Sequence, residues 1–253
     1  MRSARILLGC CGLATVGCVY ETTTSRESET TRPSIRSIAY GDTLTDPRDA
    51  KKYPTVHIGA SLWMARNLDF DTLDSSLTWC PGDTAANCAK YGRLYSWRIA
   101  MKADSTITVA CDVSLDSTGI CPDGWHIPSK SEWTSMADIL GGTGSAGDVL
   151  KATSGWMPRY DVSPGNGSDS VGFCALPAGY HFTGDQGYGA YGHTPSDSAF
   201  LDEGTDAAIW SRTNTLLGSC WSAWGAFLSK DESSVDLYAI PRTTGLAVRC
   251  VKN

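Results

Sequence analysis

The 253-residue sequence lacks most of the patterns from which enzyme chemistry is recognised. Its 4 histidines include no pair at His-x-x-x-His spacing, and no two cysteines stand at Cys-x-x-Cys spacing, so neither common zinc pattern is present. No Gly-x-Ser-x-Gly marks a serine nucleophile. No run of basic residues offers a surface for nucleic acid. These absences argue against a zinc enzyme, a serine hydrolase and a nucleic-acid-binding protein.

Long apolar runs are also scarce. Residues 6–16 form the one sustained apolar stretch, and about eleven residues is too short for a helix that crosses a bilayer, which needs about 20. Arg2 and Arg5 precede this stretch, and a basic start with a short apolar core is typical of a signal peptide. We therefore expect residues 1–17 to be removed from the mature protein.

The apolar stretch ends in Thr15-Val-Gly-Cys18, which resembles the cleavage site of a bacterial lipoprotein. The resemblance implies cleavage before Cys18 and lipid on its sulfur and its new amino group. Lipid chains hold a protein to a membrane surface without a transmembrane helix. We expect a lipid-anchored cell-envelope protein, at the outer membrane or cell surface of a Gram-negative bacterium. The alternative is an ordinary secreted protein in which Cys18 is incidental.

Residues 18–50 are predicted to be the lipidated N-terminus and a disordered tether. Glu21–Ser34 consists mainly of Thr, Ser, Glu and Arg, and so polar a segment cannot bury enough surface to offset the entropy of ordering. We interpret it as a spacer between lipid and domain, or else as a terminus without a role. Loss of residues 1–17 takes Lys and Arg from 21 to 19 against 27 Asp and Glu, so the mature charge is near −8. So acidic a chain is a poor partner for nucleic acid.

Apart from Cys18, the mature sequence keeps seven cysteines. In an exported protein they are expected to form disulfides rather than to bind metal, and an odd number leaves one over. Cys80 and Cys88 are near enough in the chain to close a small ring. The full set is Cys80, Cys88, Cys111, Cys121, Cys174, Cys220 and Cys250.

Residues 51–253 are predicted to form one irregular α+β domain, organised around Gly119–Trp133. Within that stretch Ser129 and Glu132 match a capping box, in which each side chain bonds the backbone amide of the other residue. The apolar spacing that follows predicts a helix to about Leu140, ended by the glycine at 141.

The other elements are predicted from shorter patterns. Tyr91–Met101 is expected to be the first helix, although its apolar period is imperfect. Alternation in the last strand predicts that Arg249 faces away from Leu246, Val248 and Cys250. Strands are expected where apolar residues cluster between turn residues, at 55–58, 61–64, 171–177, 208–211, 220–228, 234–240 and 246–251.

Five motifs follow one another along the domain. They are Thr55-Val-His-Ile-Gly-x-x-x-Trp-Met-Ala-x-Asn-Leu68, Asn87-Cys-Ala-Lys-Tyr-Gly-Arg-Leu-Tyr-Ser-Trp97, the stretch Gly119–Trp133, Gly172-Phe-x-Ala-Leu-Pro-Ala-Gly-Tyr180 and Val248-Arg-Cys-Val-Lys252. Over about residues 53–253 they resemble the Fibrobacter succinogenes major paralogous domain. That family is similar in pattern to C-type-lectin-like domains, including the formylglycine-generating group. The resemblance implies an α+β, C-type-lectin-like fold with two helices, a twisted antiparallel sheet and long irregular loops.

The resemblance also bears on the disulfides. In lectin-like domains the end strand is commonly tied to a segment near the second helix, which implies a bond between Cys121 and Cys250. Cys174 stands where the family more often has serine, and Cys220 also looks like an addition, so these two are expected to pair. Cys111 is then left over. The alternative pairs Cys111 with Cys121 and frees Cys250.

The best candidate for ligand binding is Gly184–His193, where tyrosines stand between glycines, together with Trp221 and Trp224. Aromatic rings can stack on sugars or serve as protein hot spots, and tyrosine–glycine mixtures suit adaptable loops. In the alternative, both tryptophans pack in the core and the glycines only permit turns. The residues expected to contact a ligand are Asp185, Tyr188, Tyr191, His193 and Trp224.

No cofactor or metal is expected, with calcium as the one ion considered. Sugar-binding lectin domains typically carry Glu-Pro-Asn or Gln-Pro-Asp and then Trp-Asn-Asp, and none of these is present. Calcium needs six to eight clustered oxygens. The acids that could supply them are interpreted as solvated loop residues; they are Asp185, Asp197, Asp202, Glu203 and Asp206.

The domain is therefore predicted to recognise a glycan or a protein without catalysing a reaction. A structural or assembly role in the cell envelope is the second hypothesis. An enzyme similar to the formylglycine-generating group is the third, with Cys220 and Cys250 as the thiols concerned. His126 lies inside the predicted turn and is expected to serve the fold.

Overall fold

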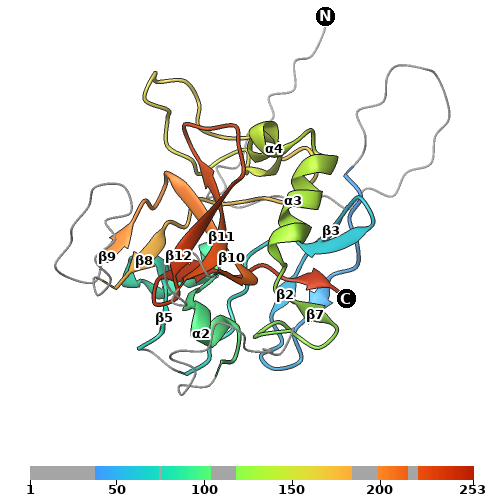
Figure 1. The fold of residues 1–253 in the computed structure, drawn as a ribbon, viewed down its shortest axis with the longest axis vertical. Coiled ribbons are helices and arrows are strands. Elements are labelled where there is room, and N and C mark those ends of the chain that lie inside the picture. Colours follow the sequence, from blue (N-terminus) through green and yellow to red (C-terminus); the bar gives the residue numbers. More distant parts are fainter. Residues whose placement is uncertain (1–37, 74–75, 104–117, 184–198, 216–221) are drawn as a thin grey trace, which may run out of the picture.

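The computed structural model describes residues 38–73, 76–103, 118–183, 199–215 and 222–253, which form a mixed α+β fold (Figure 1). Helices are few and nearly all strand pairs are antiparallel, as the predicted α+β class requires. The predicted signal peptide, Cys18 and the first part of the tether lie outside these residues. Within the ranges described, no helix has the length and apolar composition needed to cross a bilayer.

A four-stranded antiparallel sheet brings distant parts of the chain together. The two strands predicted around a turn are present as β3 and β4, and the turn contains Gly59 at φ +61°. A Cβ at Gly59 would lie 2.6 Å from Cδ1 of Ile139, so both the turn and its neighbour favour glycine. In spatial order the strands are β3 (Thr55–Ile58), β4 (Ser61–Met64), β14 (Val251–Lys252) and β7 (Trp125–His126).

An eight-stranded sheet forms the larger part of the fold. Its strands β10 and β13 run parallel where they meet at Ile209 and Ala247, and its other pairs are antiparallel. β8 (Tyr180–Phe182) pairs with β13 and with β9 (Ala199–Leu201) at its side. The main path is β12 (Asp236–Pro241), β11 (Ser222–Ser229), β10 (Asp206–Thr215), β13 (Gly245–Ala247), β6 (Leu94–Ser96) and β5 (Thr78–Trp79).

The predicted second helix is α3, Lys130–Ile139. Its capping box is confirmed, because Ser129 Oγ accepts from the Glu132 amide at 3.2 Å and the Glu132 carboxylate accepts from the Ser129 amide at 2.7 Å. A further helix, α4 (Thr143–Leu150), follows directly, where the sequence pattern predicted no helix. Because glycine is a poor helix former, the glycine content of this segment lowers its helix propensity, and the helix is not predicted from composition.

Figure 1 shows α3 between the two sheets, and the core explains this position. Trp133 of α3 is fully buried with its ring centroid 5.2 Å from that of Trp63 in β4. The same core cluster contains Ile209 and Leu228 from the larger sheet. The apolar face of one helix therefore joins the two sheets.

A second core cluster covers the other face of the larger sheet. Two of its buried tryptophans have hydrogen-bond partners: Trp97 Nε1 donates to the carbonyl of Ser211 at 2.9 Å, and Trp210 Nε1 donates to the carbonyl of Tyr95 at 2.7 Å. Satisfied indole groups of this kind allow large aromatic side chains to be buried without loss of hydrogen bonds.

The prediction of one helix over Tyr91–Met101 is wrong. Gly92 ends α1 (Ala85–Tyr91) at φ +82°, where a Cβ would lie 2.6 Å from Cβ of Asn67. Residues 94–96 then become β6, paired with β5 and β13, before α2 (Trp97–Ala100) begins. Pairing with two neighbouring strands outweighs the weak helical period. The short 3-10 helix η1 (Pro81–Asp83) precedes α1.

Residues 171–177 are buried as predicted but do not form a strand. One isolated bridge joins Ala175 to Lys151, and Cys174 has a φ of +54°. The Cys174 amide donates to the carboxylate of Asp169 at 2.7 Å. A left-handed residue in the middle of the segment prevents an extended ladder.

Arg249 faces away from Leu246, Val248 and Cys250, as predicted, but its own side is buried as well: those three belong to one core cluster, while Arg249 contacts Phe173 and Cys174 of the other. Arg249 is 1% exposed. Its Nε donates to Oδ1 of Asn67 at 2.9 Å, and its other nitrogens donate to the carbonyls of Phe173 and Cys174. The guanidinium also lies 4.1 Å from the centroid of the Phe173 ring. A buried cation is tolerated because its donors are used.

The described structure includes residues 38–50, which belong to the segment predicted as a disordered tether. The amide of Gly41 donates to the carbonyl of Thr55 at 2.9 Å, and the amide of His57 donates to the carbonyl of Ala39 at 2.7 Å. β1 (Leu44–Thr45) then pairs with β2 (Lys52–Tyr53). Composition did not reveal this because backbone pairing along the edge of β3, rather than apolar side chains, orders residues 39–42.

Candidate ligand-binding cleft

A cleft of about 670 Å³ opens on the face of the four-stranded sheet that points away from α3. This volume lies within the range of roughly 300–1,000 Å³ that is usual for small-molecule sites. Apolar side chains of Leu44, Leu62 and Trp125 form part of its lining. The polar residues around them are Asp42, Thr43, His57, Ser61, Lys252 and Asn253.

The register of the sheet explains why these residues meet. His57 pairs with Leu62 across β3 and β4, and Lys252 pairs with Trp125 across β14 and β7. Val251 of β14 pairs with Trp63 of β4, which places Lys252 beside Leu62. The four side chains therefore form one row across the sheet. The row extends across about 14 Å, since neighbouring strands lie about 4.8 Å apart.

One wall of the cleft comes from the segment before β1. A Cβ on Gly41 would lie 2.5 Å from Cδ1 of Leu62 and 2.5 Å from Oγ1 of Thr55, so this segment packs directly on the sheet. The hydroxyl of Thr55 donates to the carbonyl of Asp42 at 2.5 Å. The backbone of the wall is therefore fixed, while the side chain of Asp42 stays exposed at the cleft.

Three ionisable side chains of the cleft have no internal partner. In the part of the chain that the structure describes, no hydrogen bond or ion pair engages the side chains of Asp42, His57 or Lys252, and all three are exposed. Most acids near this region are paired; Asp46, for example, contacts the guanidinium of Arg48 at 2.6 Å. Donors and acceptors in the cleft are thus available to a ligand.

The β7 end of the cleft is held rigidly. His126 lies between two acceptors, with Nε2 2.7 Å from Oε1 of Glu132 and Nδ1 2.5 Å from Oδ1 of Asn253. The disulfide between Cys121 and Cys250 ties the turn before β7 to the segment before β14. As expected from its place in the turn, His126 serves the fold, and it also positions Asn253 at the cleft.

The carboxylate of Glu132 should give this end an acid-sensitive contribution to stability. Burial alone would raise its pKa, but hydrogen bonds from His126 and Ser129 outweigh burial and lower the pKa from 4.5 to about 2. A depressed carboxylate pKa stabilises the fold above the unfolded pKa and loses that contribution as pH falls. Glu132→Gln should therefore reduce stability by about 1 kcal/mol at pH 7, and flatten the loss of stability between about pH 4.5 and 2.

Urea unfolding over a pH series measures this effect. Glu232→Gln is the matched control, because Glu232 is exposed and its side chain makes no contact in the described structure. Equal acid dependence in wild type and Glu132→Gln would contradict the assignment.

Of the residues predicted to contact a ligand, four lie outside the described residues: Asp185, Tyr188, Tyr191 and His193. Trp224 is described, and it is half-buried beside α3, with Lys130 Nζ 3.1 Å from its ring centroid. Figure 1 places β8 and β9, which flank residues 184–198, on the far side of the molecule from β3 and β7. The cleft is therefore distant from both ends of the predicted binding loop.

No calcium-type cluster is present among the described acids. Asp202, Glu203 and Asp206 are described, whereas Asp185 and Asp197 are not, and no group of three possible metal ligands occurs in the described ranges. Burial, with the nearby Asp202 carboxylate, raises the pKa of Asp206 to about 6.

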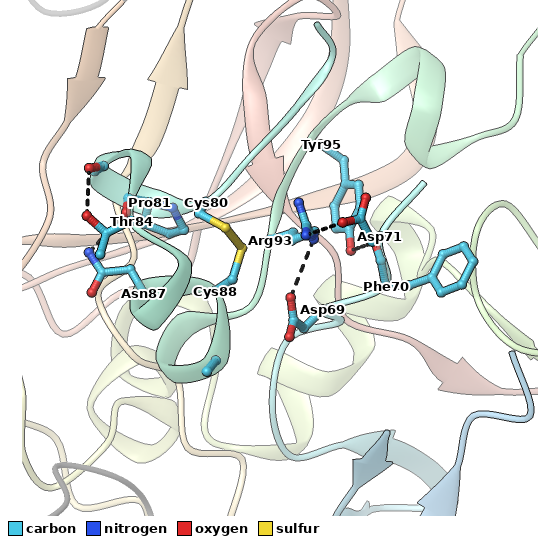
Figure 2. The surroundings of a disulfide bond; sticks show 12 residues. Asp69, Phe70, Asp71, Cys80, Pro81, Thr84, Asn87, Cys88, Arg93 and Tyr95 are labelled. Carbon is cyan, nitrogen blue, oxygen red and sulfur yellow. Dashed lines mark hydrogen bonds and ion pairs between the residues drawn. A yellow bond between two sulfur atoms is a disulfide. The ribbon is translucent and has the colours of Figure 1, made fainter. Parts of the chain in front are cut away.

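Two disulfides join the cysteines that were expected to pair. Cys121 bonds Cys250. Cys80, at the start of η1, bonds Cys88 of α1, and Figure 2 shows this second bond. Cys174 is also disulfide-bonded, whereas its expected partner Cys220 lies outside the described residues, as does Cys111.

A small charge network adjoins the Cys80–Cys88 ring. Figure 2 shows Arg93 between two acids, with Nη2 2.6 Å from Oδ2 of Asp71 and Nε 3.6 Å from Oδ1 of Asp69. Asp69 also pairs with Lys51 at 2.7 Å. These opposite charges neutralise one another, and the network ties the residue before β2 and the segment after β4 to the residue before β6.

Sequence reasoning did not single out the cleft residues. His57 between the buried Val56 and Ile58 is a recognisable sign of an outward-facing position in a strand. Nothing in the sequence, however, relates residues 42–44 to residues 252–253. Only the pairing of β14 between β4 and β7 brings the two ends of the domain to one face.

Comparison with known proteins gives a family and nothing finer. The family model described as the Fibrobacter succinogenes major domain matches residues 56–252. Neither the curated proteins nor the solved structures contain a significant match to the chain. Among the described residues, the matched span includes helices α1 to α4, the strands of both large sheets apart from the first residue of β3, and most of the cleft lining. The chain belongs to the Fibrobacter succinogenes major domain family.

Proposed function

We propose that this chain is a recognition protein of a bacterial cell envelope, anchored by lipid at Cys18, whose domain binds a glycan or protein ligand and catalyses no reaction. It would stand at the outer membrane or cell surface. The observation that carries the proposal is the cleft, in which unpartnered polar side chains surround an apolar floor. Binding sites commonly combine an apolar lining with a few polar groups that orient the ligand.

The cysteines support an exported location. Cys121 and Cys250 are bonded, Cys80 and Cys88 are bonded, and Cys174 is oxidised as well. Disulfides form and persist mainly outside the reducing cytosol. The roughly 20 residues between Cys18 and the first described residue can reach at most about 70 Å when extended. Such a tether would let the cleft meet ligands away from the lipid surface.

A C-type-lectin-like arrangement is part of the proposal. Its support is the bond between Cys121 and Cys250, which ties the end of the chain to the turn before α3, as the resemblance implied. The position of α3 between two antiparallel sheets is a second support. An experimental structure, compared with lectin-like domains, would decide it.

A structural or assembly role is favoured by a separate feature. Met157, Tyr160 and Val162 are 52%, 90% and 85% exposed on one loop. The loop is held at Tyr160 itself, whose amide donates to the carboxylate of Asp231 at 2.9 Å and whose ring centroid lies 3.9 Å from Lys230 Nζ. A fixed, exposed apolar tip is suited to contact with a neighbouring protein.

The test is a binding screen with the full chain, produced with its own leader. Recovery in the membrane fraction, with lipid mass on the peptide that contains Cys18, is the expected result for the anchor. The purified protein is then applied to a glycan array and to envelope extract, each with calcium and with chelator. Binding to a glycan, or to one envelope protein, supports recognition. No binding in any arm would overturn it.

A further inference from the structure

The charges of the cleft narrow the class of ligand. Asp42 contributes one carboxylate, Lys252 one ammonium group and His57 an imidazole. Phosphate groups and nucleic acids are bound by several convergent cations, often including the paired donors of arginine. The cleft has one lysine and one aspartate, so it does not supply several convergent cations. An uncharged polar ligand fits this balance better than an anion does.

The backbone next to the cleft narrows the class of ligand further. An extended peptide commonly binds by adding a strand to a free sheet edge. On the outer side of β3 that edge is occupied, because the Gly41 amide donates to the Thr55 carbonyl and the His57 amide donates to the Ala39 carbonyl. Tyr40 also forms a bridge with Val56. Strand addition at this edge is therefore blocked by the chain itself.

The groups that remain are side chains which can both donate and accept over an apolar floor. Hydroxyls of Thr43 and Ser61 lie with the carboxylate, imidazole and ammonium groups around Leu62 and Trp125. A sugar ring has matching chemistry, because its C–H face is apolar and each of its hydroxyls donates and accepts. A cleft about 14 Å along its row of side chains is long enough for more than one ring.

We infer that the cleft between residues 42–44 and the outer face of the β3–β4–β14–β7 sheet binds a neutral oligosaccharide. This inference rests on the proposed function and names the ligand class and place of that recognition. Asp42 accepts from sugar hydroxyls, Lys252 and His57 donate to them, and Leu62 with Trp125 contacts the ring face. Binding needs no calcium, since Asp42 is the only acidic side chain in this lining.

The experiment compares variants of the full chain on one array of short neutral oligosaccharides and their uronate counterparts, with and without chelator. Asp42→Ala and Lys252→Ala each remove one direct contact and should weaken binding about tenfold. Glu232→Gln and Lys102→Ala are the matched controls; both residues are exposed and lie outside the cleft lining. Thermal unfolding of each variant separates loss of binding from loss of fold.

A second measurement locates the ligand. Hydrogen exchange with the bound oligosaccharide should slow at residues 42–44 and 60–62, which line the cleft. The expected result is chelator-resistant binding, weakened by the two cleft variants and retained by Tyr188→Ala with Tyr191→Ala.

Three outcomes overturn the inference while the proposed function stands. They are binding that survives both cleft variants, binding that is abolished by chelator, and binding of an envelope protein with no oligosaccharide bound. Absence of any ligand in the wider screen overturns the inference and the proposed function together.

Discussion

Replacing Cys121 and Cys250 together with alanine is expected to lower the free energy of unfolding by about 5 kcal/mol, the largest effect of any change considered for this protein. The bond closes a loop with a sequence separation of 129, and a crosslink over so long a loop removes much entropy from the unfolded chain. Both cysteines are buried, at 3% and 0% exposed. A loss of this size approaches the whole stability of a typical domain, which is about 5–15 kcal/mol.

The matched control is the double replacement of Cys80 and Cys88. Their separation is 8, for which the same loop-entropy estimate gives about 2.5 kcal/mol. Urea unfolding of oxidised proteins measures both values. Equal losses for the two bonds would show that loop length does not govern their contributions. The longer bond also holds the β7 end of the cleft, so its removal should weaken ligand binding even where the domain stays folded.

Arg249→Ala is expected to cost about 3–5 kcal/mol, because it leaves three buried acceptors without their donor. These are Oδ1 of Asn67 and the carbonyls of Phe173 and Cys174. The substitution also opens a cavity against the ring of Phe173, whose centroid lies 4.1 Å from the guanidinium.

A second substitution separates the two causes. Arg249→Met fills most of the volume but supplies no donor, so it should recover only the cavity part of the loss. Arg66→Ala is the control, since Arg66 donates one exposed hydrogen bond to the carbonyl of Ala89 and should cost less than about 1 kcal/mol. Thermal and urea unfolding report these differences. A loss below about 1 kcal/mol for Arg249→Ala would contradict this account.

Local patterns predicted those elements whose contacts are local. The capping box at Ser129 and Glu132 is confirmed because its partners lie three residues apart. The hairpin of β3 and β4 is confirmed because its turn residue and alternating side chains are adjacent in the chain. The small ring between Cys80 and Cys88 follows from the same proximity.

Predictions failed where distant segments decide the conformation. The helix predicted over Tyr91–Met101 is interrupted by β6, which pairs with β5 on one side and β13 on the other. Alternation predicted the face that Arg249 occupies, but not that Asn67 and the backbone near Phe173 enclose it there. The tether was extended to residue 50, although residues 39–42 pair with β3.

The sequence by itself determined the family, the mixed α+β class, the capped helix α3 and the cysteines available for disulfides. Motif spacing and short-range periodicity carry this information. Tertiary structure alone decided the cleft. Its wall comes from residues 42–44 and its row of side chains from β3, β4, β14 and β7, with Asn253 directly after β14. The physical reason is that side chains separated by about 200 residues share a face only after β14 pairs between β4 and β7. Register across strands, unlike alternation along one strand, leaves no periodic trace in the sequence.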